Sequence, residues 1–281
     1  MSGTRNETNE PESSEVAHET TIFAEPVFQI GNFNVTNSLI NTWLVVLFFM
    51  IIALFLRKKL TKIPTGIQNL FEIMIEGALS LCDSVTGNRV KSLHFFPLVF
   101  VLFAFILVSN WTGLIPGVGS IGFIENHGQQ NVFIPLFRGG TADVNTTLAL
   151  AIFSIVLTHI FGIIFLGAWT YLNKFINIKA ILEIPRKVRQ EPAILLVNPI
   201  KIFVGFVEII GEIAKIASLS FRLFGNVFAG EVLLASIAAM FAFVAPIPFM
   251  FLEVLVGLVQ AIVFSMLVLV FLSMSTTAEE H

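Results

Sequence analysis

The chain has 281 residues, of which 56% are hydrophobic and only 12% are charged, and its mean hydropathy is +0.87. A soluble domain of this length needs more charged residues to cover its surface, so the excess apolar residues have to face lipid. The net charge of −3 provides no basic surface for nucleic acid. The single cysteine, Cys82, excludes an intrachain disulfide framework and a cysteine-based metal site, and we expect it to fill space as a buried thiol.

The start of the chain differs in composition from the rest. Residues 1–21 are polar and acidic, and they lack the basic start and the apolar core of a cleavable signal peptide. We therefore predict a polar external tail over residues 1–38, loosely held or disordered at its beginning. A single transmembrane domain is predicted over residues 39–281.

A helix needs about 20 apolar residues to cross the hydrocarbon core of a bilayer. Apolar stretches of this kind lie at 39–56, 95–115, 146–172, 199–244 and 249–274. Pro246 and Pro248 lie between the last two stretches and predict a tight turn there, because two prolines cannot continue a helix. The sequence therefore predicts an all-α polytopic membrane protein with about five transmembrane helices, the last two forming a long tilted hairpin.

The basic residues predict an orientation in the membrane. Lysines and arginines cluster at 57–62 and at 174–189. Because short cytoplasmic loops are enriched in these residues, both clusters are predicted to be cytoplasmic. This places the N-terminus and the loop 117–143 outside and the C-terminus inside, and every loop agrees with that assignment.

Residues 67–82 are predicted to form an amphipathic helix that lies at the cytoplasmic interface instead of crossing. Glu72, Glu76 and Asp83 fall on one helical face. The opposite face is apolar and consists of Leu70, Phe71, Met74, Ala78 and Leu81. A helix packed on protein with its acids in water is the alternative.

The fourth apolar stretch carries an unusual row of polar side chains. At about 100° per residue, its charged and amide residues fall in one narrow stripe. The stripe consists of Glu208, Glu212, Lys215, Arg222 and Asn226. Facing lipid, each charge would cost about 2.5–3.5 kcal/mol. The stripe must therefore face protein, water or the charge of a partner.

A second stripe, made of small residues, runs beside the polar one. It consists of Gly211, Ala214, Ser218, Gly225 and Ala229. Small residues let another helix approach closely in lipid. Packing within the chain explains such a stripe equally well, but the neighbouring arginine favours an interface with a partner helix.

Arg222 keeps its proton at any physiological pH, whereas a buried lysine can become neutral. A permanent cation can favour the ionised form of an opposing carboxylate and drive its proton off. It can also separate two water paths, because it repels protons. The alternative is a structural ion pair with an acid of this chain, such as Glu253.

The acids lie at different depths around Arg222. Glu208 lies about 21 Å along the helix on the cytoplasmic side, and Glu231 about 13 Å on the external side. Glu231 points roughly 140° away from the polar stripe, at about 100° per residue, and should face another helix.

On the last stretch, Glu253, Gly257 and Gln260 share one face, and the proline turn brings Glu253 to the same outer half as Glu231. Two carboxylates that converge on one cavity can relay protons. Glu212 and Lys215 are expected to form an ordinary pair three residues apart. This layout is that of two offset half-channels.

Residues 218–231, SLSFRLFGNVFAGE, closely resemble the signature of subunit a of the F-type ATP synthase. The resemblance extends to the segments 109–111, 143–147 and 260–264 and to the Glu-Glu-His ending. It implies a stator that is not an enzyme on its own, binds no cofactor or metal, and conducts protons, with Na⁺ as the alternative ion. The implied partners are the ring of c subunits, the b subunits of the peripheral stalk and membrane lipid, in a bacterial plasma membrane.

The resemblance also implies roles for individual residues. The essential arginine of the family corresponds to Arg222. External channel residues correspond to Asn226, Glu231, Glu253 and Gln260, and the cytoplasmic one corresponds to Glu208. Asp143 matches an acidic position near the external mouth. Some members carry histidine where this chain has Glu253, which leaves the relay chemistry there open, and His159 matches no motif and is predicted to be packed and hydrogen-bonded.

Two other classes of function remain open. A stand-alone ion channel or transporter would need only the intramembrane acids, but the chain shows no inverted repeat and no polar cluster large enough for a substrate. A structural membrane scaffold would need neither Arg222 nor acids at these depths.

Overall fold

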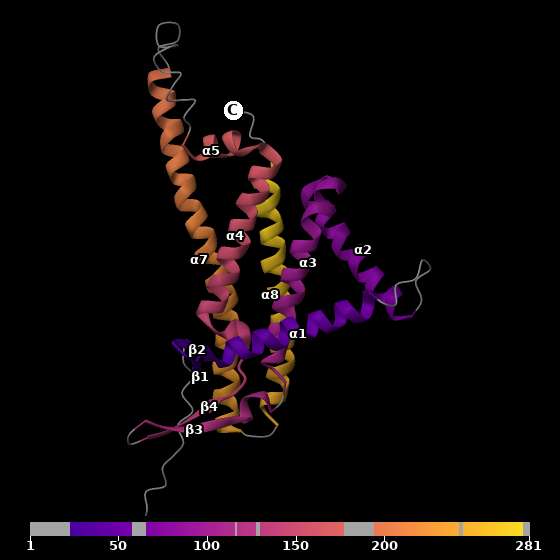
Figure 1. Ribbon diagram of the computed structural model, residues 1–281, viewed down its shortest axis with the longest axis vertical. Helices are drawn as coiled ribbons and strands as arrows, with labels where there is room; N and C mark the ends of the chain where they lie inside the picture. Colours follow the sequence, from indigo (N-terminus) through magenta and orange to yellow (C-terminus); the bar gives the residue numbers. More distant parts are fainter. Residues whose placement is uncertain are drawn as a thin grey trace, which may run out of the picture.

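The computed structural model describes residues 23–57, 66–115, 117–127, 130–176, 194–241 and 244–277. Its helices are α1 (Asn37–Arg57), α2 (Ile67–Thr86), α3 (Arg89–Thr112), α4 (Val144–Leu166), α5 (Ala168–Ile176), α7 (Ile194–Met240) and α8 (Pro246–Ser275) (Figure 1). The strands are β1 (Pro26–Ile30), β2 (Phe33–Thr36), β3 (Gly122–His127) and β4 (Gln130–Pro135), and two short 3₁₀ helices are η1 (Val118–Ser120) and η2 (Gly140–Ala142).

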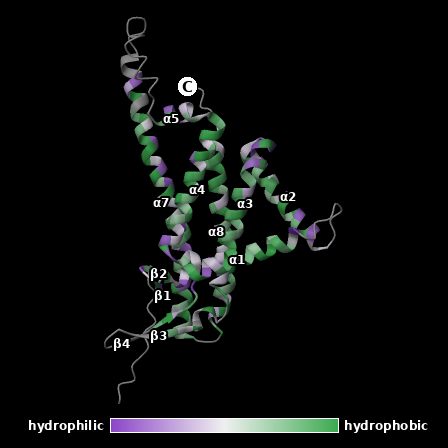
Figure 2. Ribbon diagram, in the orientation of Figure 1, coloured by the Kyte–Doolittle hydropathy of each residue, from purple (hydrophilic) through white to green (hydrophobic). Residues whose placement is uncertain are grey.

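The long helices confirm the prediction of an all-α polytopic membrane protein. Within the described residues, four helices are long and apolar enough to cross a membrane, namely α1, α3, α4 and α8. The hydropathy colouring shows that these helices are mainly hydrophobic (Figure 2). α7 corresponds to the fifth predicted crossing and runs beside α4 and α8 in the same bundle (Figure 1).

The length of α7 exceeds what a perpendicular crossing needs. It has 47 residues, or about 70 Å at 1.5 Å per residue, whereas the hydrocarbon core is about 30 Å thick. α7 and its partner α8 must therefore tilt strongly or extend out of the membrane, as the sequence predicted for this hairpin.

The core lies between α3, α4, α7 and α8. Its fully buried side chains are aromatic and branched aliphatic residues contributed by all four helices, including Phe95, Ile155, Leu223, Phe264 and Val268. The rings of Phe95 and Phe161 meet edge to face with their centroids 5.6 Å apart. Because these contacts join helices that are distant in sequence, the core fixes the positions of the four helices relative to one another.

Two predicted boundaries were wrong. The third stretch was predicted to continue to residue 172, but α4 ends at Leu166 and the short helix α5 crosses the end of the bundle (Figure 1). Gly167 breaks the helix with a φ of 83°, a conformation that only glycine adopts readily. Pro246 and Pro248 were predicted to form a turn, but they begin α8. The first turn of a helix tolerates proline because its N–H groups have no intrahelical partner.

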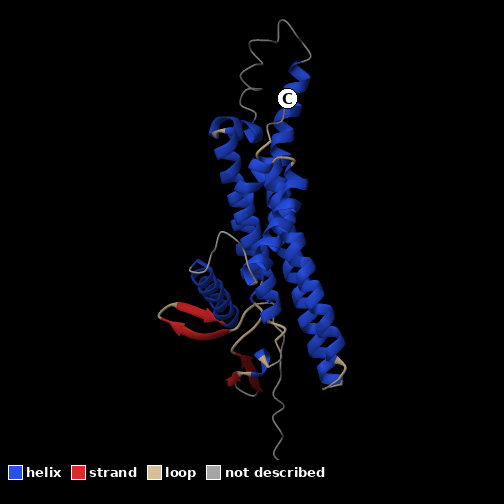
Figure 3. Ribbon diagram, turned by 90° about the vertical axis from the view of Figure 1, so that its right-hand side faces the viewer, coloured by secondary structure: helices blue, strands red, loops and turns tan. Residues whose placement is uncertain are grey.

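Two antiparallel hairpins, β1–β2 and β3–β4, were not predicted. Both lie toward the end of the bundle where α7 turns into α8 (Figures 1 and 3). The β1–β2 hairpin occupies part of the predicted N-terminal tail, whereas residues 1–22 lie outside the described residues. Most of the predicted basic clusters lie outside them as well.

Polar contacts attach the first turns of α1 to this end of the bundle. Asn37 Nδ2 donates to the backbone oxygen of Pro135 (3.3 Å), and Ser38 Oγ donates to Asp143 Oδ2 (3.2 Å). Asn41 Nδ2 donates to Thr112 Oγ1 at 3.0 Å. The second half of α1 is mostly exposed, so its apolar side chains are available to lipid or to a neighbouring helix.

α2 is amphipathic as predicted and packs on α3 and α8 through Leu79 and Cys82, both buried. Leu70, Met74 and Leu81 of its predicted apolar face remain exposed in the isolated chain. The helix therefore combines a contact with protein near its end with an apolar surface that is free to lie on a membrane. Cys82 fills space in the core, as expected.

Candidate functional site

α7 has an inward face and an outward face at the level of its polar stripe. Leu219, Ser220 and Leu223 are buried, and the Ser220 hydroxyl is hydrogen-bonded to the Thr147 hydroxyl of α4 (3.2 Å). These contacts fix the rotation of α7 about its axis. The outward face consequently carries Arg222.

The guanidinium of Arg222 lies on the outside of the bundle. The side chain is exposed, and its Nη2 donates a long hydrogen bond to Ser218 Oγ, one turn earlier (3.4 Å). Glu253, the acid considered as an internal partner, has its carboxylate against Gly230 of α7. Among the described residues the two form no ion pair, so the structure does not have the internal pair that was the alternative.

The stripe of small residues lies on the same exposed side. Ala214, Ser218, Gly225 and Ala229 are exposed and Gly211 is partly exposed. A Cβ atom added to Gly211 or Gly225 would meet no atom within 4 Å. The described part of the chain therefore does not use this stripe for its own helix packing, and the surface is smooth enough for another helix.

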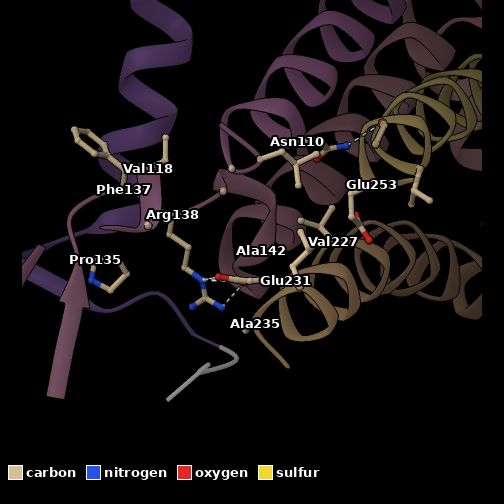
Figure 4. Close-up of a pocket in the computed structure, with 17 residues that line it drawn as sticks. Asn110, Val118, Pro135, Phe137, Arg138, Ala142, Val227, Glu231, Ala235 and Glu253 are labelled. Atoms are coloured by element: carbon tan, nitrogen blue, oxygen red, sulfur yellow. Dashed lines mark hydrogen bonds and ion pairs between the residues drawn. The ribbon is translucent and has the colours of Figure 1, made fainter. Parts of the chain in front are cut away.

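An outer cavity of about 220 Å³ opens between α7, α8 and the segment that follows β4 (Figure 4). We define it by Asn110, Arg138, Glu231, Glu253 and Gly257, which are among its lining residues. Figure 4 shows the Glu231 and Glu253 side chains on its wall, one from α7 and one from α8. The predicted convergence of these two acids on one cavity is therefore present.

Arg138 forms a two-pronged ion pair with Glu231 across this cavity (Figure 4). Its Nε lies 3.0 Å from Glu231 Oε1, and its Nη2 lies 2.9 Å from Oε2. The side chain of Arg138 is only 5% exposed, against 32% for Glu231. Bidentate geometry of this kind fixes both groups and is stronger than a neutral hydrogen bond.

Sequence reasoning placed Glu231 facing away from the polar stripe but missed Arg138. One signal was available. Arg138 is the only lysine or arginine between residues 92 and 173, and it occurs in a loop predicted to be external. A lone cation on the side of the membrane that disfavours lysine and arginine indicates a specific partner.

Amide side chains continue from the outer cavity toward Arg222. Asn110 Nδ2 donates to the backbone oxygen of Gly257 (3.1 Å) and Asn110 Oδ1 accepts from Thr141 Oγ1 (2.5 Å). One turn after Arg222, Asn226 Nδ2 donates to Gln260 Oε1 (2.6 Å). Gln260 is buried, and within the described part of the chain its Nε2 has no hydrogen-bond partner.

Asp143 is buried and serves as the N-cap of α4. Its carboxylate accepts hydrogen bonds from the backbone N–H of Asn145 and from the hydroxyls of Thr146 and Ser38, each at 3.2 Å. The outer cavity is lined by other residues of this segment. The role of Asp143 at an external mouth stays a prediction, and its observed contacts are those of a helix cap.

An inner cavity of about 70 Å³ lies toward the other end of α7. We define it by His159 of α4, Tyr171 of α5 and Glu208, Glu212 and Lys215 of α7. Lys215 Nζ lies 2.7 Å from Glu212 Oε1, which confirms the predicted pair. Burial, with Glu212 and Glu208 nearby, raises the pKa of Tyr171 to about 12.

His159 is packed and hydrogen-bonded, as predicted. Its Nδ1 lies 2.5 Å from the Tyr171 hydroxyl, and its Nε2 lies 3.7 Å from Glu212 Oε2.

The two cavities lie on opposite sides of Arg222 along α7. Over the described ranges, no group of three or more His, Cys, Asp or Glu side chains could hold a metal ion.

Comparison with known proteins gives one consistent result. A family model described as ATP synthase A chain matches residues 39–273. A protein named ATP synthase subunit a from Syntrophobacter fumaroxidans is 34% identical over 244 residues, covering 86% of this chain and 85% of its own. Proteins of the same name from Trichlorobacter lovleyi (33% over 236 residues, 84% and 85% covered) and Moorella thermoacetica (30% over 247 residues, 88% and 94% covered) are similar.

Proposed function

Because the chain belongs to the ATP synthase A chain family, we propose that it is the proton-conducting stator subunit of the membrane sector of an F-type ATP synthase. It stands against a ring of c subunits and is held by the b subunits of the peripheral stalk. Two offset half-channels carry protons to and from the ring, and ATP is formed elsewhere in the complex. Proton flow through this subunit turns the ring.

The observation that carries the proposal is the exposure of Arg222 on a smooth face of α7. A charged side chain at this position in a membrane bundle needs an acidic or aqueous neighbour. Side chains of this face do not keep a partner helix away from Arg222, because Gly211 and Gly225 leave open space. A ring of helices that carries one carboxylate per subunit brings these carboxylates past the guanidinium one after another, and each can pair with it.

The outer path begins at the cavity that holds Glu231 and Glu253. A proton from the external side is taken up there and passes along waters hydrogen-bonded to Gln260 and Asn226. It then protonates a ring carboxylate, which can enter lipid as a neutral acid. The Asn226–Gln260 hydrogen bond supports this route because it lies one turn from Arg222 and joins α7 to α8.

The inner path begins where a ring carboxylate meets Arg222 after its turn. A positive charge within about 4–6 Å favours the ionised carboxylate. The released proton passes to the inner cavity, where Glu208 and Glu212 lie on α7. Since guanidinium cannot give up its own proton, it also prevents a direct passage between the two paths.

The proposed sidedness follows the basic clusters, with the N-terminus and both strand hairpins outside and the C-terminus in the cytoplasm of a bacterial cell. The hairpins and the α7–α8 turn are assigned to the same side because they lie at the same end of the bundle (Figures 1 and 3).

The outer path is tested by isosteric removal of its carboxylates. We expect Glu231→Gln and Glu253→Gln to slow passive proton conductance about tenfold or more, since a relay group contributes at least that much, while the complex still assembles. Gly230→Ala is expected to slow conductance as well, because its new Cβ would displace the Glu253 carboxylate. Unchanged conductance in both Gln variants would refute the channel role, as measured by a pH-sensitive dye in vesicles under an imposed potential.

The proposed ring-facing surface is tested by crosslinking. In a Cys82→Ser background, we expect Ser218→Cys and Ala229→Cys to be joined to the c subunit by a short photoactivatable maleimide. Ile213→Cys is the matched control, since Ile213 is exposed on the opposite side of α7. Mass spectrometry identifies the attached chain. Equal c-subunit attachment at position 213, or none at positions 218 and 229, would contradict the assignment of this face.

A further inference from the structure

We infer that His159 carries protons through the inner cavity and that Tyr171 positions its imidazole ring for that step. The inference rests on the proposed function, since it adds a residue to the inner path. Neither the family signature nor the stripe of α7 includes these two side chains. They come from α4 and α5 and meet the acids of α7 in one cavity.

The contacts of His159 separate the tasks of its two ring nitrogens. Nδ1 lies 2.5 Å from the Tyr171 hydroxyl, so the two groups are hydrogen-bonded. We assign Nδ1–H as the donor to Tyr171 Oη in both charge states of the ring. Nε2 is then the atom that gains and loses a proton, and it faces Glu212 Oε2 at 3.7 Å.

Gly162 explains why the Tyr171 hydroxyl reaches this position. Gly162 is buried one turn after His159 on α4, and a Cβ atom there would clash with the ring of Tyr171. The missing side chain forms a notch in α4 that accepts the aromatic ring. The Phe175 ring packs against both rings, with its centroid 6.0 Å from that of His159 and 5.5 Å from that of Tyr171. The imidazole is therefore held in one orientation by packing as well as by its hydrogen bond.

The charges around the cavity suit an imidazole that becomes cationic. α7 contributes Glu208, Glu212 and Lys215, and the phenol of Tyr171, whose pKa is raised to about 12, is neutral. α8 contributes Phe271, Met274 and Ser275, which are uncharged. Two carboxylates and one ammonium leave a net charge of about −1, by formal charge at neutral pH. Uptake of a proton by His159 neutralises it.

A water molecule can complete the transfer, because 3.7 Å is too long for a direct hydrogen bond between Nε2 and Glu212. The cavity volume of about 70 Å³ has room for more than one water. In the proposed step, a proton released near Arg222 moves along water to Nε2, forming an N–H bond. The same N–H bond then breaks toward water on the cytoplasmic side, and the neutral ring is restored.

The test measures ATP-driven proton pumping by complete complexes in inverted vesicles, divided by the ATPase rate of the same vesicles with uncoupler. The bath then faces the cytoplasmic side, and its pH is varied across the imidazole range of about 5 to 8. We expect a midpoint within that range for the unmodified protein. His159→Gln removes the midpoint and lowers the rate about tenfold, as loss of an acid–base group does.

Two further variants separate proton transfer from a structural role. Tyr171→Phe and Gly162→Ala both keep His159 but loosen its orientation, so each is expected to move the midpoint. His94→Gln is the matched control, because His94 is exposed on α3 and contacts the backbone of its own helix (2.7 Å to the Val90 oxygen). It should leave rate and midpoint unchanged.

Retention of the midpoint in His159→Gln overturns the inference, whatever happens to the rate. If His159→Gln complexes do not assemble, the midpoint in Tyr171→Phe decides, and an unmoved midpoint overturns it. Failure of the proposed function has a different signature, since it requires wild-type pumping by Arg222→Ala complexes. Blocked pumping in Arg222→Ala with an unchanged His159→Gln profile refutes only the role of His159.

Discussion

Replacement of Arg222 by alanine is expected to slow coupled proton pumping strongly while the complex remains assembled. The side chain is exposed and its contact within the chain is a long hydrogen bond to Ser218 (3.4 Å), so its loss costs little folding energy. In the proposed mechanism, the substitution removes the cation that ionises the ring carboxylate. A neighbouring positive charge shifts such a group by about 1–3 pKa units, so proton release should slow about 10- to 1,000-fold.

Arg222→Lys and Arg89→Ala make the comparison specific. Lysine keeps a positive charge but can lose its proton in a low-dielectric site, so intermediate pumping with proton leak is expected. Arg89 is an exposed arginine outside both cavities that pairs with Asp83, and its alanine variant should pump normally. The measurement is ATP-driven acidification of vesicles. Pumping at the wild-type rate by Arg222→Ala would refute the mechanism.

Arg138→Met is expected to have the second largest effect, mainly on stability. The substitution removes the bidentate partner of Glu231. The Arg138 side chain is only 5% exposed, so the pair is largely buried. Breaking a buried pair by removing one partner costs about 3–5 kcal/mol. Because Glu231 is 32% exposed, we expect a value near the lower limit, about 3 kcal/mol. The loss of stability is measured by thermal denaturation of the purified complex, with release of this subunit as the signal.

The double variant Arg138→Met/Glu231→Gln distinguishes the structural role of the pair from its role in proton transfer. Removing both charges should recover most of the lost stability, because no uncompensated charge remains. Proton conductance should stay low, since the carboxylate that we propose as a relay is gone. If the two substitutions destabilise additively, the residues do not act as a pair.

The direction of each residue on α7 could be predicted because helical periodicity is a local property. The stripe with Arg222 and the divergence of Glu231 both follow from about 100° per residue. The pairing of Glu212 with Lys215, three residues apart, is equally local. By contrast, the end of α4 was missed, since one glycine at a φ of 83° decides it.

The contacts that sequence could not supply are those between distant segments. Arg138 meets Glu231 across 93 residues of sequence, and its position depends on the path of an irregular segment after β4. Tyr171 reaches His159 because the chain turns at Gly167 and α5 crosses the end of the bundle next to α4 (Figure 1). Such loop paths are set by many weak contacts, and no periodic pattern in the sequence encodes them.

The polar attachment of α1 has a consequence for biosynthesis. Asn37 and Ser38 find their partners 98 and 105 residues later in the chain. A ribosome adds about 5–20 residues per second, so synthesis of that interval takes about 5 to 20 s. If α1 is inserted as it is synthesised, its amide and hydroxyl groups lack their final acceptors throughout this time. Insertion of this chain therefore includes a waiting period, in which the translocon or surrounding lipid headgroups must shelter the beginning of α1.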